Sequence, residues 1–388
     1  MSVTSLRIWG PALTLGAAAF IFVTAEMLPV GLLPVIAQSL GESEATTGLL
    51  LTIYAWGVTT MGLPLTILTA RFDRRVLILA VFCIFICGNT FSALAGTFAM
   101  LMAARICIAM SHSIFWAIVP PLSMRVAPSG GKARALGITV TGTSLATVLG
   151  VPLGTILGHY FGWRFTFGTV AAVAFGMAII LWRVLPPEPS ENVGNVRSLS
   201  EIVRNKPLLH IYTLMLLTAT GQYATFTYFS PFMQTLGGFN SSIIAALLLT
   251  LGAAGVFGSI VGSKLIEMPG SRPVVIPLLI LCLLLLLLPA AARLGLVAVS
   301  LLVIIWGVFY TFISMVLQIR AVTASLASAD LATAIFSGSF NAGVGFGALT
   351  GSYAFSTLGI EYTAYTGAAF LLVAGLIGLI PVYGDTKE

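Results

Sequence analysis

Long apolar segments recur along the whole length of this chain, and they restrict its fold more than any other feature. A helix that crosses a bilayer needs about 20 apolar residues, and these segments are near or above that length. Charged residues make up only 8% of the chain, whereas soluble domains carry about 25%. We therefore predict an all-α integral membrane protein with twelve transmembrane helices, at approximately 9–37, 47–70, 76–96, 98–124, 134–160, 165–185, 208–234, 241–265, 273–291, 295–319, 330–357 and 361–383.

The chain divides into two halves of similar length. The longest polar stretch, PPEPSENVGNVRSLSEIVRNK at 186–206, separates six apolar segments from six. We predict an N-terminal six-helix half at 1–185, a cytoplasmic central loop at 186–207 with a short surface helix at 198–204, and a C-terminal six-helix half at 208–388. GTSLATVLGVPLGTILG (142–158) aligns with SFNAGVGFGALTGSYAF (339–355) at an offset of 197 residues, which favours two homologous, pseudo-symmetric halves.

Lysine and arginine gather in alternate loops between the apolar segments. The loops after the second, fourth, sixth, eighth and tenth segments carry these cations, whereas the intervening loops hold only Arg164 and Arg293. Loops rich in Lys and Arg face the cytoplasm, so both termini are expected there. The cations are spread over short loops rather than gathered in one patch, which argues against a nucleic-acid partner.

Glu26 lies inside the first apolar segment, in FIFVTAEMLPVGLLP (20–34). An ionisable side chain at the bilayer centre costs about 2.5–3.5 kcal/mol on insertion scales, so such residues are usually functional. Burial disfavours the charged form of a carboxyl, which suits a site that binds and releases a proton. Pro29 cannot donate to the carbonyl of Ala25, so the helix is loosened beside the acid. The alternative is a structural hydrogen bond made by the protonated carboxyl.

The fourth segment carries the second buried charge. Arg105, His112 and Trp116 in RICIAMSHSIFW (105–116) are spaced by seven and four residues, which puts them on one helix face. A cation, an imidazole and an indole on one stripe resemble the wall of a pocket. The alternatives are an aromatic residue packed in the bundle and a hydrogen bond between helices.

Neutral polar side chains lie beside aromatic ones in the later segments. Gln222 and Tyr223 belong to GQYATFTYFSPF (221–232), Trp306 and Tyr310 are four residues apart, and Asn341 follows in the eleventh segment. Amides and hydroxyls next to flat rings suit a neutral polyol, whereas a cationic drug more often needs a further buried acid. Tyrosine and tryptophan near span ends can instead anchor a helix at the membrane interface.

The sequence also excludes several functions. It holds no phosphate-binding loop, no serine-hydrolase or metalloprotease motif and no Cys/His spacing typical of zinc sites. A nucleotide-driven pump would need a soluble ATPase domain, and no segment is long enough for one. We therefore predict a protein that is not an enzyme and that uses neither a cofactor nor a metal.

The arrangement of six and six spans around a central loop resembles the major facilitator superfamily over the full chain. GVPLG (150–154) resembles the antiporter motif of its drug/proton exchanger branch, which implies packing or gating roles for Gly150, Pro152 and Gly154. FDRRVLIL (72–79) resembles the end of the G-x-L-A-D-R-x-G-R-R loop motif, which implies a gating role for Arg74 and Arg75. The chain departs from that motif at Thr66, Ala70 and Asp73.

Four stretches resemble bacterial sugar efflux transporters of that branch: FIFVTAEMLPVGLLP, LTIYAW (51–56), HSIFWAI (112–118) and FGWRFTF (161–167). The resemblance implies proton-coupled export of arabinose-like pentoses or galactosides across the bacterial inner membrane, by a monomer embedded in the lipid bilayer. Glu26 and Arg105 would couple protons, and the substrate would be bound by His112, Trp116, Gln222, Tyr223 and Asn341. At Gln222 the nearest members of that group are expected to have histidine.

Other functions stay open at this point. A multidrug/proton antiporter of the same fold is the main alternative. A passive facilitator, in which Glu26 is structural, is a second. An intramembrane enzyme has no supporting group of residues in the sequence.

Overall fold

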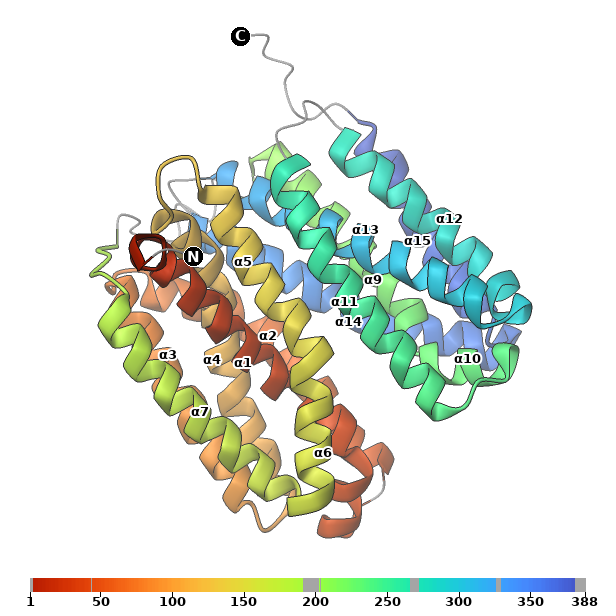
Figure 1. The fold of residues 1–388 in the computed structure, drawn as a ribbon, viewed down its shortest axis with the longest axis horizontal. Helices are drawn as coiled ribbons and strands as arrows, with labels where there is room; N and C mark the ends of the chain where they lie inside the picture. Colours follow the sequence, from red (N-terminus) through yellow and green to blue (C-terminus); the bar gives the residue numbers. More distant parts are fainter. Residues whose placement is uncertain are drawn as a thin grey trace. The chain divides into compact units, whose positions relative to one another are not determined.

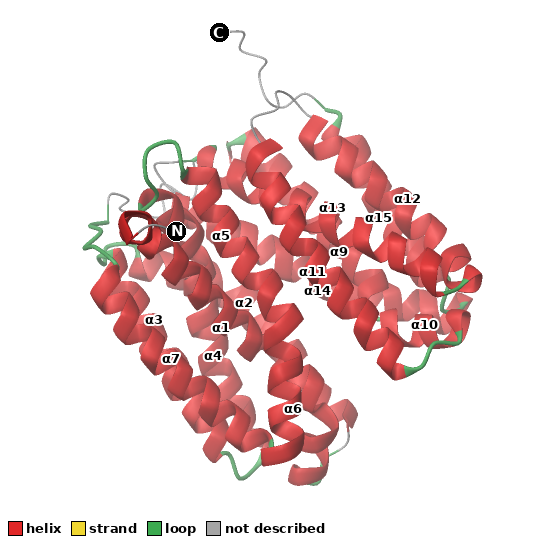
Figure 2. Cartoon of the chain, in the orientation of Figure 1, coloured by secondary structure: helices red, strands yellow, loops and turns green. Residues whose placement is uncertain are grey.

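The computed structural model describes residues 3–42, 44–190, 202, 204–265, 272–325 and 329–380. Across these ranges every regular element is a helix (Figure 2). The first half contains α1 (Val3–Leu40), α2 (Glu44–Thr69), α3 (Arg74–Leu94), α4 (Phe98–Arg125), α5 (Lys132–Leu145), the π-type turn η1 (Ala146–Gly150), α6 (Val151–Phe161) and α7 (Trp163–Val184). The second half contains α9 (Lys206–Phe226), α10 (Phe229–Gly237), α11 (Ser241–Leu265), α12 (Arg272–Leu294), α13 (Leu296–Thr323), α14 (Ala329–Leu358) and α15 (Tyr362–Gly378).

Many of these helices can cross a membrane. Seven helices in the described ranges are long and apolar enough to do so, namely those of α1, α3, α4, α7, α11, α12 and α13. Shorter apolar helices cover 53–69 and 362–378. A helix satisfies its own backbone hydrogen bonds, which is why lipid-facing segments of this composition are helical. Each predicted segment coincides with a helix or, in two places, with a broken one.

The two breaks correct the sequence prediction, which treated each segment as continuous. The segment at 134–160 changes to a π-type turn at Ala146–Gly150 between α5 and α6. Pro152 follows directly, and it has no N–H for the carbonyl four residues before it. The segment at 208–234 ends one helix at Phe226 and begins another at Phe229. Pro231 likewise cannot donate to the carbonyl of Thr227, so the helix is interrupted there.

The chain forms two compact units, Met1–Leu199 with Leu326–Gly338 and Ser200–Ser325 with Ser339–Glu388. Most of the predicted central loop, including 191–201 and residue 203, lies outside the described residues, as does most of the helix expected at 198–204. The predicted domain limits therefore stay a prediction.

In the first unit α1 is the central helix, in contact with α2, α4, α5, α6 and α7. Figure 1 shows α3 and α7 side by side, and these two helices pack together. The core between α1, α3 and α4 is aromatic: Phe22 stacks on Phe85 and Phe115 with ring centroids 4.1 Å and 3.9 Å apart. This core packs α1 against α4 one helical turn from Glu26.

Glycines let α5 and α6 approach α1 closely. A Cβ atom added at Gly150 would overlap the side chain of Thr24, and one at Gly154 would overlap Leu28. In the second unit the glycines of α14 do the same against α9, where a Cβ at Gly347 would lie 2.6 Å from the carbonyl oxygen of Thr220. Gly150 and Gly347 are the positions that the 197-residue offset aligns, so each unit uses the aligned glycine against its own first helix.

Candidate functional site

Glu26 and His112 face each other in the first unit. Glu26 lies on α1 with its side chain 18% exposed, and His112 lies on α4 with its side chain 3% exposed. Glu26 Oε2 is 3.4 Å from His112 Nε2. At that separation a small side-chain movement brings the two groups into hydrogen-bond contact, and catalytic and coupling pairs are often this loose without their ligand. The pair can therefore share one proton.

Arg105 binds the backbone of α1 rather than the Glu26 carboxylate in this structure. The guanidinium is fully buried, and its Nη1 and Nη2 atoms donate to the carbonyl oxygens of Ala25 and Glu26 at 3.0 Å and 3.1 Å. The carbonyl of Ala25 is the one that loses its helical donor because Pro29 has no N–H. Arg105 supplies the missing donor, so it fixes the loosened turn of α1 that carries Glu26.

Tyr54 on α2 completes this cluster, although it was not among the site residues predicted from the sequence. The guanidinium carbon of Arg105 lies 4.3 Å from the centroid of the Tyr54 ring, a cation–π arrangement. The rings of Tyr54 and His112 are 5.4 Å apart, edge to face. The available signal was a phenol in the middle of an apolar segment, within LTIYAW, but tyrosine is too common in membrane helices to stand out.

Aromatic rings surround His112. Phe22 and Trp116 each lie with their ring centroids 6.0 Å from that of His112, and Trp116 is partly exposed. Arg105 and Trp116 thus both lie near His112 on the same face of α4, as their spacing predicts. The imidazole is held in an apolar cage with the carboxyl as its one acidic neighbour among the described residues.

Several polar atoms of this cluster are buried without a hydrogen-bond partner. They are Tyr54 Oη, Arg105 Nε and His112 Nδ1. A buried polar group that stays unpaired costs about 1–3 kcal/mol, so these three atoms are available to a polar partner. The first unit therefore offers a carboxyl, an imidazole, a phenol and aromatic faces in one place.

The polar residues of the second unit lie on α9, α13 and α14, and one of the predicted contacts, Gln222, is hydrogen-bonded through its oxygen. Trp306 Nε1 donates to Gln222 Oε1 at 2.6 Å, and both side chains are buried. The Gln222 carbonyl thus ties α9 to α13. Tyr223 packs edge to face on Phe340 with centroids 6.0 Å apart, and Asn341 is buried on α14. The Tyr310 hydroxyl is buried, and it interacts with the side chain of Ser314 on the same helix.

The motif at 72–79 is organised around an ion pair. Arg74 and Asp330, at the start of α3 and near the start of α14, form a buried ion pair within the first unit. Arg75 donates through its side chain to the carbonyl oxygen of Trp182. Asp73, which departs from the family motif, caps α3 by accepting hydrogen bonds from the N–H groups of Arg75 and Val76 at 2.9 Å and 3.1 Å. The departure therefore has a structural use as a helix cap.

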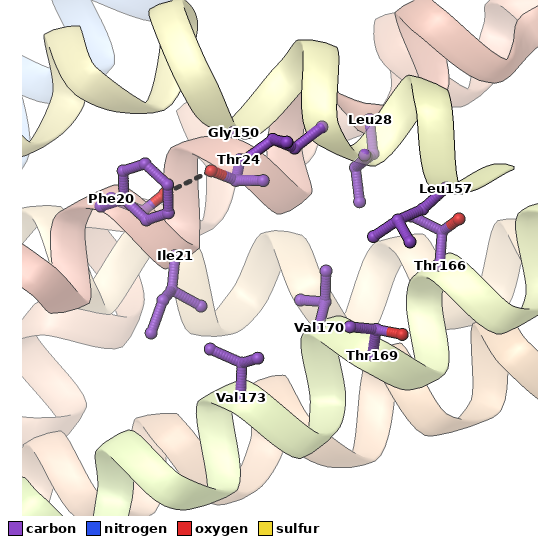
Figure 3. A pocket seen from close by; sticks show the side chains of 12 residues that line it. Phe20, Ile21, Thr24, Leu28, Gly150, Leu157, Thr166, Thr169, Val170 and Val173 are labelled. Carbon is purple, nitrogen blue, oxygen red and sulfur yellow. Dashed lines mark hydrogen bonds between the residues drawn. The ribbon is translucent and has the colours of Figure 1, made fainter.

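A separate cavity of about 190 Å³ opens between α1, η1, α6 and α7 (Figure 3). Its walls are apolar apart from the hydroxyls of Thr24, Thr166 and Thr169, and Thr24 Oγ1 already donates to the carbonyl oxygen of Phe20 at 2.7 Å. It does not include Glu26 or His112. A sugar needs several polar partners, so this cavity is a poor sugar site. Within the described ranges no three His, Cys, Asp or Glu residues are grouped as metal ligands would be.

Comparison with known proteins places this geometry in a known fold. A family model described as the Major Facilitator Superfamily matches residues 15–330. The structure of the Major Facilitator Superfamily transporter FucP in the outward conformation is 15% identical, with a TM-score of 0.75 over 96% of this chain and 98% of that chain. A second structure, of a variant of the E. coli fucose:proton symporter FucP, is likewise 15% identical, with a TM-score of 0.73 over 96% of this chain and 98% of that chain.

The proton:xylose symporter XylE, bound to 6-bromo-6-deoxy-D-glucose, is 14% identical, with a TM-score of 0.75 over 96% of this chain and 95% of that chain. At these identities the likeness establishes the fold rather than the substrate. The predicted all-helical fold of this superfamily is confirmed.

Proposed function

The chain belongs to the Major Facilitator Superfamily and is therefore a membrane transporter, and from this we propose that it exports small sugars in exchange for protons. The observation that carries the proposal is the Glu26–His112 pair, buried among aromatic rings and surrounded by polar atoms without partners. A transporter that couples to protons needs a group that changes charge during each cycle. Glu26 is the group that we assign to this task.

Arg105 has a supporting part in this proposal. Its two hydrogen bonds to the backbone fix the turn of α1 that carries Glu26. Its positive charge also favours the ionised carboxylate whenever the proton leaves, since an opposite charge nearby stabilises an anion. We therefore propose that Glu26 binds the proton and that Arg105 sets how readily it is released.

The proposed solute is a neutral sugar of the pentose or galactoside type. Trp116 offers a flat face for the apolar side of a sugar ring, and His112 offers a hydrogen bond. Gln222, Tyr223 and Asn341 remain proposed sugar contacts, with Gln222 contributing its amide N–H₂ because its oxygen is bound to Trp306. The similar structures include fucose:proton and proton:xylose symporters, so the fold accommodates sugars together with protons.

The direction of transport and the cellular setting belong to the proposal as well. Efflux by antiport rests on the resemblance to sugar efflux transporters. We place the protein in the bacterial inner membrane as a monomer with both termini in the cytoplasm. Arg74 and Arg75 are the proposed gating residues, and Gly150, Pro152 and Gly154 the proposed packing or hinge residues; the side chain of Pro152 lies outside the described residues.

Counterflow in proteoliposomes tests the substrate class. Proteoliposomes that contain the purified protein are loaded with an unlabelled pentose, galactoside or lipophilic cationic dye. Uptake of labelled arabinose is then followed with and without an imposed pH gradient. We expect sugars to drive counterflow, dyes to fail, and a pH gradient to drive arabinose uphill. Counterflow with dyes alone would instead support the multidrug antiporter. Arabinose movement that does not depend on the pH gradient would support a passive facilitator.

A set of alanine variants tests the proposed contacts. His112→Ala, Trp116→Ala, Gln222→Ala and Asn341→Ala are measured for equilibrium arabinose binding, and each buried hydrogen bond lost should weaken binding by about 1–3 kcal/mol. Trp182→Ala, an exposed tryptophan of α7, serves as the matched control for Trp116. Parent-like binding by all four variants would place the sugar site elsewhere.

A further inference from the structure

The two ring nitrogens of His112 have different surroundings. Nε2 lies 3.4 Å from Glu26 Oε2, whereas Nδ1 is buried and has no hydrogen-bond partner. A neutral imidazole has one donor nitrogen and one acceptor nitrogen, and the partner of one nitrogen decides the state of the other. The protonation state of Glu26 therefore determines whether Nδ1 is a hydrogen-bond donor or acceptor.

Resting on the proposed function, we propose that His112 is a tautomeric relay that carries a proton between Nδ1, to which we assign the sugar hydroxyl, and Glu26. When Glu26 is ionised, the N–H of Nε2 donates to Oε2 and Nδ1 is an acceptor. A hydronium ion gives its proton to Nδ1 and leaves as water, an N–H bond forms at Nδ1, and the proton on Nε2 moves to Oε2. One proton has then entered, Glu26 is neutral, the ring is neutral again, and Nδ1 has become a donor.

The surroundings of the pair favour this route over a lasting imidazolium. Arg105 on α4 and Tyr54 on α2 are the charged and titratable side chains that act on Glu26 and His112, and the described residues of α5, α6 and α7 add none. Arg105 already holds a positive charge in this buried place. A second cation on His112 would be repelled by it, whereas the relay leaves the ring neutral in both end states.

The relay predicts which ligand atom Nδ1 can hold. A hydroxyl donates to Nδ1 while Glu26 is ionised, and it accepts from the Nδ1–H once Glu26 is protonated, so it remains bound in both states. An ether oxygen can only accept. A sugar whose contacting hydroxyl is methylated should therefore bind only the protonated form. A sugar hydroxyl is thus a group that this nitrogen can hold in either tautomer, whereas an ether oxygen is held in one tautomer alone.

Nitrogen-15 NMR on the full protein in lipid nanodiscs tests the relay directly. The three histidines are labelled, and the His112 signals are identified by their loss in His112→Gln. We expect one protonated nitrogen at every pH, which is Nε2 at alkaline pH and Nδ1 at acidic pH. Glu26→Gln should abolish the exchange of tautomers. Glu42→Gln, at an exposed acid beyond the end of α1, should leave it as in the parent.

Two results would overturn the relay: protonation of both ring nitrogens at acidic pH, or a tautomer that does not change over the titration. A tautomer exchange that persists in Glu26→Gln would also overturn it, because another group would then drive the ring. Arabinose export into a pH gradient, measured on the same preparation, separates this proposal from the proposed function. Proton-driven export without a change of tautomer would contradict the relay alone. A change of tautomer without proton-driven export would contradict the proposed function.

Discussion

At the scale of single residues, Arg105 supplies the hydrogen-bond donor that Pro29 lacks for the carbonyl of Ala25. The two Nη atoms reach two neighbouring carbonyl oxygens, those of Ala25 and Glu26, which a lysine ammonium cannot match with the same fixed geometry. The buried cation is thus first a backbone partner, and its influence on Glu26 follows from that position.

This account predicts a coupling between Arg105 and Pro29. Arg105→Ala should destabilise the protein by about 1–3 kcal/mol, because a buried carbonyl is left unpaired, and Arg105→Lys should do so less. Pro29→Ala restores an N–H for the carbonyl of Ala25, so Arg105→Ala should be less damaging in that background. Thermal unfolding of the two single variants and the double variant in detergent measures the coupling. Strictly additive effects would show that Arg105 does not serve the carbonyl that Pro29 frees.

The sequence predicted part of this site for physical reasons. Glu26 and Arg105 stood out because charges are rare inside apolar segments, and Pro29 pointed to the unpaired carbonyl of Ala25. Tyr54 did not stand out, because a tyrosine in a membrane helix needs no special explanation. The pairing of Gln222 with Trp306 could not be predicted either, since a hydrogen bond between helices far apart in sequence depends on how those helices pack.

At the scale of helices, α6 and η1 approach α1 closely in the first unit because glycines lie at the contact. Apolar length predicted where the helices lie, because every backbone group in lipid must be paired within the helix. It did not predict the breaks at Ala146–Gly150 and after Phe226, because hydropathy carries no information about which backbone donor is missing. Pro152 and Pro231 did carry that information.

Gly150 tests this helix contact. Gly150→Ala places a Cβ against the side chain of Thr24 and should destabilise the protein by about 1–3 kcal/mol through overpacking. Gly176→Ala on α7 is the matched control, because a Cβ there meets open space. It should be neutral or stabilising by up to about 1 kcal/mol, since alanine favours the helix. Equal melting temperatures for the two variants would contradict the close contact of α1 with η1.

The ion pair between α3 and α14 offers a second test at this scale. Asp330→Asn leaves Arg74 buried without its counter-charge, and removing one partner of such a pair costs about 3–5 kcal/mol. Glu361→Gln breaks the pair with Arg293, whose side chain is 54% exposed, and should cost about 0–1 kcal/mol. Denaturation in detergent compares the two variants. A similar small effect for both would mean that the Arg74–Asp330 pair is solvated rather than buried.

At the scale of the whole molecule, the proposed proton carrier Glu26 and the proposed solute contacts of the first unit lie in one cluster. Glu26, His112 and Tyr54 come from three different helices, and Arg105 ties α4 to the backbone of α1. A ligand shifts a conformational equilibrium only through different affinities for the two states, so a proton and a sugar that share neighbours can influence each other. Coupling is then a property of the shared cluster and not of one residue.

The central claim is that Glu26 carries the exchanged proton. The most direct measurement is proton movement, followed with a pH-sensitive dye trapped in proteoliposomes, during arabinose counterflow and during uphill arabinose transport. During uphill arabinose transport we expect proton movement opposite to the sugar in the parent and in Glu42→Gln, whereas counterflow exchanges sugar for sugar and moves no net protons. In Glu26→Gln we expect arabinose exchange without proton movement and without uphill transport. Uphill arabinose transport with proton movement in Glu26→Gln, at parent levels of protein, would contradict the account.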